Sequence, residues 1–147
     1  MSRRATRELA LKVLFQVDVG RADPKRALRY TAAQQRVGVD EAEAARELSE
    51  DDIIFAGELV DGALEHMSTI DQTISDHAKE WRIERMANID RNVLRLALYE
   101  MTYRDDIPVS VSINEAVELA KKFGTEESGK FVNGILGNAA RLLKRDE

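Results

Sequence analysis

Apolar residues recur every three or four positions along most of this chain, a spacing that places them on one side of an α-helix. The run from Ile113 to Phe123 is a clear example. Only 8 glycines and 2 prolines occur among the 147 residues, which are too few turn-forming residues for the many tight turns of a β-sandwich or barrel. We therefore predict an all-α fold, a compact helical bundle of about seven helices.

The apolar spacing also gives approximate helix bounds. We expect helices over residues 2–19, 24–36, 49–64, 70–81, 86–97, 113–123 and 125–143. Residues 39–50 are acidic and weakly patterned, and we interpret them as a surface segment.

Several residues have the properties of helix ends. Ser2 and Asp23 are the expected caps of the first two helices, because each directly precedes a helical pattern. Ser112 and Glu115 have the spacing of a capping box. Gly124 stands where a left-handed C-cap belongs. Two further glycines, three positions apart, indicate that a neighbouring helix packs closely on the backbone of the last helix. These glycines are Gly134 and Gly137.

Several classes of site are excluded or disfavoured by residue content. The chain has no cysteine, so it has no disulfide, thiolate metal site or cysteine nucleophile. His66 and His77 have no carboxylates at metal-ligand spacing. Residues 124–130 match P-loop spacing, but Phe131 replaces the serine or threonine that would hold magnesium. We expect no catalytic residue, no metal and no cofactor, and thus no enzyme.

No apolar run approaches the roughly 20 residues needed to cross a bilayer, and Lys12 interrupts the one near the N-terminus. We therefore expect a cytoplasmic protein without a membrane-spanning segment.

Charge is uneven along the chain, whose formal net charge is -5. Arg3, Arg4 and Arg7 gather in the first turns of the first helix, where cations oppose the helix dipole. They suit either a polyanion or a solvated N-terminus. Leu11 and Phe15 lie on the same side of this helix as the three arginines and outside its main apolar stripe. The first helix is therefore either central to the bundle or docks a partner with its second apolar face.

Four blocks in order resemble the NusB family of bacterial transcription antitermination factors. These are residues 3–15, residues 89–100, the segment 107–124 with its Ile-Pro-Val and Ile-Asn-Glu-Ala-Val-Glu-Leu-Ala-Lys-Lys-Phe-Gly runs, and residues 128–136. The resemblance implies a single RNA-binding domain over 1–147, built from two packed helical subdomains. It also implies binding to boxA-type single-stranded RNA of nascent ribosomal transcripts, together with the small-subunit ribosomal protein that acts as NusE, within an antitermination complex on RNA polymerase.

The resemblance also implies site residues. RNA contacts are expected at two groups of residues, Arg3, Arg4 and Arg7 in the first helix and Glu127, Lys130 and Phe131 in the last. Lys130 would meet phosphate beside the amides of a helix N-terminus, and Phe131 either stacks on a base or fills the core. The ribosomal partner is expected at Phe15 and Asp90.

Two alternatives remain open at this point. One is a free-standing relative of the helical RNA-binding domain of ribosomal RNA methyltransferases. The other is a homodimer that masks its own arginine face.

Overall fold

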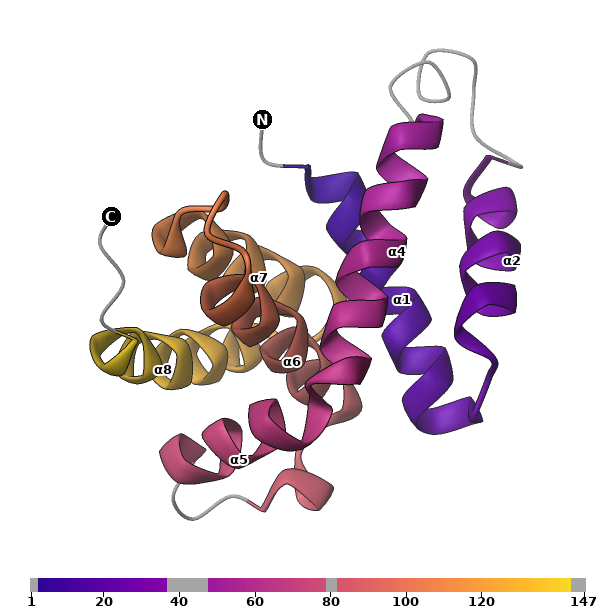
Figure 1. Ribbon diagram of the computed structural model, residues 1–147. Coiled ribbons are helices and arrows are strands. Elements are labelled where there is room, and N and C mark those ends of the chain that lie inside the picture. The colour runs from indigo at the N-terminus through magenta and orange to yellow at the C-terminus, as the bar shows by residue number, and fades with distance from the viewer. Residues whose placement is uncertain (1–2, 37–47, 79–81, 144–147) are drawn as a thin grey trace. The chain divides into compact units, whose positions relative to one another are not determined.

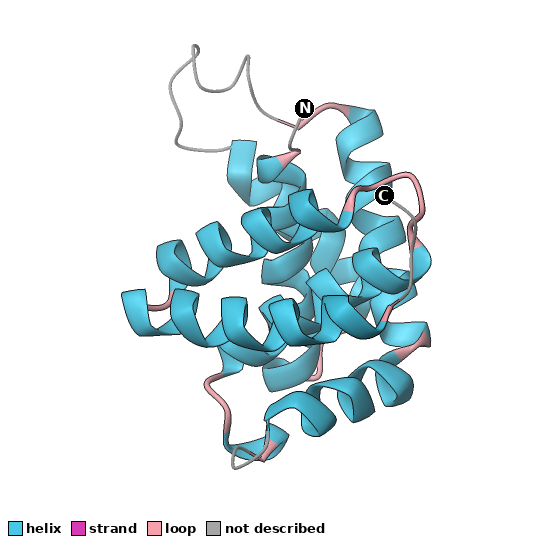
Figure 2. Ribbon diagram, turned by 90° about the vertical axis from the view of Figure 1, so that its left-hand side faces the viewer, coloured by secondary structure: helices cyan, strands magenta, loops and turns pink. Residues whose placement is uncertain are grey.

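The structure is a computed structural model that describes residues 3–36, 48–78 and 82–143. Within these ranges it contains seven α-helices, one short 3-10 helix and no strand. Figure 2 shows the helices and the loops that join them. The all-α prediction is confirmed. The helices are α1 (Arg4–Gly20), α2 (Pro24–Arg36), α4 (Glu50–Glu65), α5 (Met67–Ala78), η1 (Ile83–Arg85), α6 (Asn88–Tyr103), α7 (Val109–Phe123) and α8 (Glu126–Leu142).

The chain divides into two compact units, Met1–Asp61 and Gly62–Glu147, as the resemblance implied. The boundary falls within α4. That residues 1–147 act as a single domain stays a prediction. No helix in the described ranges is long and apolar enough to cross a membrane.

The first unit contains α1, α2 and most of α4 (Figure 1). A three-residue connection makes α1 and α2 antiparallel neighbours. Asp23 Oδ2 accepts a hydrogen bond from the Arg26 amide at 3.0 Å, which confirms the predicted cap. Ser49 Oγ accepts from the Asp52 amide at 3.1 Å, and Asp52 Oδ2 accepts from the Ser49 amide at 3.0 Å. This reciprocal pair starts α4 where the sequence predicted it.

Apolar residues from all three helices of this unit are buried. They are Leu9, Ala10, Leu11, Val13, Leu14, Ala27, Ala32, Phe55, Ala56, Leu59 and Val60, and Leu48 just before α4 is also buried. A polar contact joins α1 to α2, because Gln16 Nε2 donates to Thr31 Oγ1 at 2.7 Å.

In the second unit, α8 packs against α5, α6 and α7. Arg95 on α6 holds α5 through two parallel hydrogen bonds, from Nε to Asp71 Oδ1 at 2.8 Å and from Nη2 to Asp71 Oδ2 at 2.9 Å. Arg95 is buried, so this paired geometry satisfies a charge that would otherwise be costly. The unit also buries Ile70, Ile74, Val93, Leu94, Leu96, Leu98, Met101, Ala116, Leu119, Ala120, Val132, Ile135 and Leu136.

The predicted capping box at Ser112 and Glu115 is wrong. Helix α7 begins at Val109, with Pro108 at the N-cap position, so both residues lie inside the helix. Ser112 is buried, and its hydroxyl donates to Glu100 Oε1 at 2.8 Å. The serine therefore joins α7 to α6.

The structure does not support the reasons given for three glycines, namely a left-handed conformation at Gly124 and close helix packing at Gly134 and Gly137. Gly124 has φ −117°, which is not left-handed. It is needed because a Cβ there would lie 2.8 Å from the Ala120 carbonyl oxygen and 2.6 Å from Ser128 Oγ. No described atom lies within 4 Å of a Cβ built on Gly134 or Gly137, so no helix approaches them closely.

Some expectations fall outside the described residues. These are the cap at Ser2, most of the segment 39–50, and Trp81 at the end of the helix predicted over 70–81.

Candidate functional site

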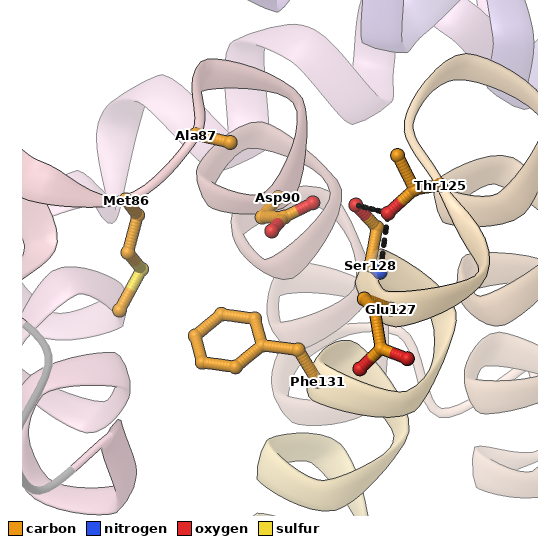
Figure 3. A pocket seen from close by; sticks show the side chains of 7 residues that line it. All are labelled: Met86, Ala87, Asp90, Thr125, Glu127, Ser128 and Phe131. Atoms are coloured by element: carbon orange, nitrogen blue, oxygen red, sulfur yellow. Dashed lines mark hydrogen bonds between the residues drawn. The ribbon is translucent and has the colours of Figure 1, made fainter.

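A pocket of about 420 Å³ lies in the second unit, where the N-terminal ends of α6 and α8 meet (Figure 3). Its lining comes from two stretches of sequence that the fold brings together. The lining residues are Met86, Ala87, Asp90, Thr125, Glu127, Ser128 and Phe131. Three of the predicted site residues, Asp90, Glu127 and Phe131, therefore share one pocket.

The start of α8 is held by its own side chains. Thr125 is the N-cap residue, and its Oγ1 accepts from the Ser128 amide at 3.1 Å. The two hydroxyl oxygens are 3.4 Å apart. The Ser128 amide is thus already hydrogen-bonded, and a phosphate contact beside Lys130 stays a prediction.

Asp90 places a partly buried carboxylate in the lining of the pocket. It lies in the first turn of α6, and its Oδ1 is buried without a hydrogen-bond partner among the described residues. Burial raises the pKa of this carboxyl above its ordinary value, and a hydrogen bond from Ser128 lowers it in part. The carboxylate therefore lines the pocket with one oxygen that the protein encloses and that lacks a partner among the described residues.

Phe131 forms the apolar side of the pocket. Its side chain is half-buried, and Figure 3 shows the ring extending toward Met86. A half-buried ring in the wall of a pocket suits a flat or apolar group. Such a group is present both on an RNA base and on a protein side chain, so stacking on a base stays a prediction for Phe131.

Lys130 lies one residue before Phe131 and faces solvent. Its Nζ is 3.6 Å from Glu127 Oε1, and the two side chains are 76% and 84% exposed. An ion pair this exposed contributes at most about 1 kcal/mol. It therefore leaves Lys130 able to exchange Glu127 for a phosphate.

The three arginines at the start of α1 lie in the first unit and differ in how exposed their side chains are. Arg3 and Arg4 are exposed, and the Arg3 guanidinium carbon lies 4.1 Å from the centre of the Phe55 ring. Arg7 is only 3% exposed. The prediction that Arg7 faces outward with the other two is wrong, because it lies on the same side of α1 as Leu11 and Leu14, which are also buried.

Phe15, the other predicted partner contact, is half-buried on α1. Leu11, one turn earlier, is 1% exposed and belongs to the core. The second apolar face of α1 is thus covered at Leu11 and partly open at Phe15.

The sequence analysis did not predict four of the lining residues as part of a site: Met86, Ala87, Thr125 and Ser128. Met86 was placed inside a helix, whereas α6 begins at Asn88. Thr125 and Ser128 have the spacing of a side-chain cap, which was a usable signal for the start of α8. Nothing in the sequence near Ser128 points to Asp90.

Comparisons with known proteins agree over nearly the whole chain. The NusB family model matches residues 4–141. A Desulforamulus reducens protein named transcription antitermination protein NusB is 52% identical over 147 residues, which cover 100% of this chain and 94% of the relative. A Heliobacterium modesticaldum protein of the same name is 53% identical over 144 residues, which cover 98% of this chain and 65% of that longer relative.

Among solved structures, one of the antitermination factors NusB and NusE in complex with dsRNA has a similar fold. The TM-score is 0.81 and the identity is 27%, and the match covers 95% of this chain and 96% of the other.

Proposed function

The chain belongs to the NusB family, and on that premise we propose that it acts as a transcription antitermination factor. In this proposal it binds boxA-type RNA of nascent ribosomal transcripts together with the small-subunit ribosomal protein NusE, and joins a complex on RNA polymerase in the cytoplasm. It works by binding and has no catalytic step. Relatives with this function match it over most of its length, which favours this proposal over a detached methyltransferase domain.

The observation that carries the proposal is the shared pocket. Asp90 is expected to meet the ribosomal partner, and Glu127 and Phe131 are expected to meet RNA, yet all three line one pocket. RNA and partner would then touch each other there as well as this chain. Two modest binding surfaces joined in this way raise the effective concentration of each ligand for the other.

Phosphate contacts come from exposed cations in this proposal. Arg3 and Arg4 supply them in the first unit, and Lys130 supplies one beside the pocket. Arg7 is left out because its side chain is buried.

A titration with labelled boxA-type RNA, with and without the purified ribosomal protein, tests the proposal. We expect the partner to tighten RNA binding and added salt to weaken it. Arg4→Ala and Phe131→Ala are expected to weaken binding without changing helical content by circular dichroism. Arg141→Ala is the control, because Arg141 is an exposed cation in the last turn of α8.

Absence of RNA binding in the presence of the partner would reject the proposed function. Equal losses in Arg4→Ala and Arg141→Ala would remove Arg4 from the site and leave only a general charge effect. Light scattering during gel filtration tests the homodimer, which stays a prediction: a mass near 16.6 kDa excludes it.

A further inference from the structure

The outer side of α2 carries a concentration of exposed cations that the proposed function does not use. We call it the α2 cationic face. It consists of four exposed residues on the helix, Lys25, Arg26, Arg29 and Tyr30, and of exposed Arg21 in the connection just before the helix. Among residues 21–34 only Asp23 carries a negative charge, and its Oδ2 is engaged with the amide of Arg26. Tyr30 is 64% exposed, which is unusual for a large aromatic side chain.

Helical geometry places these side chains together. At about 100° per residue, Lys25, Arg29, Arg26 and Tyr30 fall within an arc of about 140°. Ala33 lies inside the same arc and is exposed, so the space beside Tyr30 is not filled by a longer side chain. The opposite arc carries the buried residues Ala27 and Thr31, and buried Ala32 borders the arc next to Lys25.

Stability does not account for this arrangement. Lys25 and Arg26 stand in the first turn of α2, which has no acidic residue, and cations there oppose the helix dipole. Arg21 has φ 54°, a left-handed conformation in which glycine or asparagine costs less than arginine. Three of the four cations thus occupy positions that a residue chosen for stability would not fill.

We propose that the α2 cationic face binds a second stretch of single-stranded RNA, with the cations on its phosphates and the Tyr30 ring stacked on a base. Cations interleaved with an exposed aromatic ring are the usual surface for single strands, because phosphates and unstacked bases are both within reach. An acidic peptide would use the cations but would leave Tyr30 without a role.

This inference rests on the proposed RNA binding and extends it. The 17 residues of α1 separate Arg4 from Arg21 by about 25 Å along the helix axis. The two groups of cations therefore cannot hold the same phosphate. The α2 cationic face would instead hold nucleotides beyond those that Arg3 and Arg4 contact, so its contribution should depend on RNA length.

The test compares a boxA-type RNA of about 12 nucleotides with the same sequence extended to about 30, because binding sites for single strands span about 4 to 16 nucleotides per module. Fluorescence anisotropy is measured over a series of salt concentrations, with the ribosomal partner present. Two variants remove charge, Lys25→Gln with Arg29→Gln, and Arg21→Gly. Glutamine keeps helix propensity, and glycine suits the conformation of residue 21, so neither change should unfold α2.

We expect the wild-type chain to bind the longer RNA more tightly. The Lys25→Gln, Arg29→Gln variant should lose this gain, and its slope of log affinity against log salt should fall by about 1.4, for two phosphates at about 0.7 each. Arg21→Gly should weaken binding to the longer RNA in the same direction. Tyr30→Ala should weaken binding to the longer RNA about fivefold or more, with the salt slope unchanged. Binding to the short RNA should be unaffected throughout.

A matched control removes two exposed cations elsewhere, with Lys122→Gln and Arg141→Gln. Equal affinities of wild type and the α2 variants for the longer RNA would overturn the inference, as would equal losses in the control. Displacement of the longer RNA by polyglutamate as readily as by unlabelled RNA would also overturn it. Failure of the wild-type chain to bind even the short RNA would instead reject the proposed function.

Discussion

Replacing Asp90 by asparagine tests the electrostatics of the pocket. Two effects oppose each other at this position. The carboxylate lies in the first turn of α6, where a negative charge gains about 0.3 to 1 kcal/mol from the helix dipole. Its buried Oδ1 lacks a partner among the described residues, and such an acceptor costs about 1 to 3 kcal/mol. The pKa is raised by burial, which indicates that the second effect is the larger.

We therefore expect Asp90→Asn to raise the free energy of unfolding at pH 7 by about 1 kcal/mol, because the neutral amide removes the charge that burial penalises. The gain stays small because Asp90 is partly exposed and because the amide is also polar. The midpoint of thermal unfolding should rise by about 2 to 4 °C. The same change should weaken binding of the ribosomal partner. A residue that is kept at a cost in stability is typical of a binding site.

The effect should depend on pH in a direction set by the raised pKa. The folded chain holds the Asp90 proton more tightly than the unfolded chain does, so protonation stabilises the fold. The advantage of Asp90→Asn should be full at pH values above the raised pKa. It should shrink as the pH falls through that value toward the ordinary value of 3.8.

Urea unfolding followed by circular dichroism at several pH values measures this difference directly. Asp51→Asn is the matched control, since Asp51 is an exposed aspartate in the first turn of α4. Asp51→Asn should lower the free energy of unfolding by about 0.3 to 1 kcal/mol, an effect opposite in sign to that of Asp90→Asn. The reasoning is refuted if Asp90→Asn destabilises the chain as Asp51→Asn does, or if its effect is the same at every pH.

Three further changes test the core by urea unfolding. Asp71→Ala should cost about 3 kcal/mol, because it leaves the buried guanidinium of Arg95 without its carboxylate; a smaller loss when Arg95→Met is added would confirm the coupling. Ser112→Ala should cost about 1 to 3 kcal/mol through loss of the hydrogen bond to buried Glu100, and a neutral result would contradict that contact. Arg7→Ala should cost about 1 to 3 kcal/mol because its side chain is buried, and weaker RNA binding at unchanged stability would contradict this assignment.

The sequence predicted most helices well because their signals are local. Apolar spacing and the cap at Asp23 each involve residues within a few positions of one another, and this cap is present. Ser49 caps α4 in an equally local way, near the helix start that the sequence predicted. The pair Ser112 and Glu115 was wrongly predicted to cap a helix, because the same spacing also occurs inside a helix. What distinguishes the two cases is Glu100 on a different helix, which no local pattern includes.

Some residues of the candidate site could be predicted from the sequence, but their assembly could not. Arg7 was misplaced because its charge was given more weight than its position one turn before buried Leu11. Asp90 and Phe131 were both named, yet for different ligands, because their proximity arises only when α8 docks on α6. The cations of α2 have no local motif, and their shared exposure becomes evident only once the buried side of that helix is known.

The pocket is assembled from segments about 40 residues apart in sequence, one at the start of α6 and one at the start of α8. During synthesis, α6 is made well before α8, so a growing chain exposes Asp90 and Met86 without the opposite wall. Recognition through this pocket is then a property that the chain acquires late, after α8 has left the ribosome and docked. A partly made copy would therefore lack the pocket even when α1 and α2 are already complete.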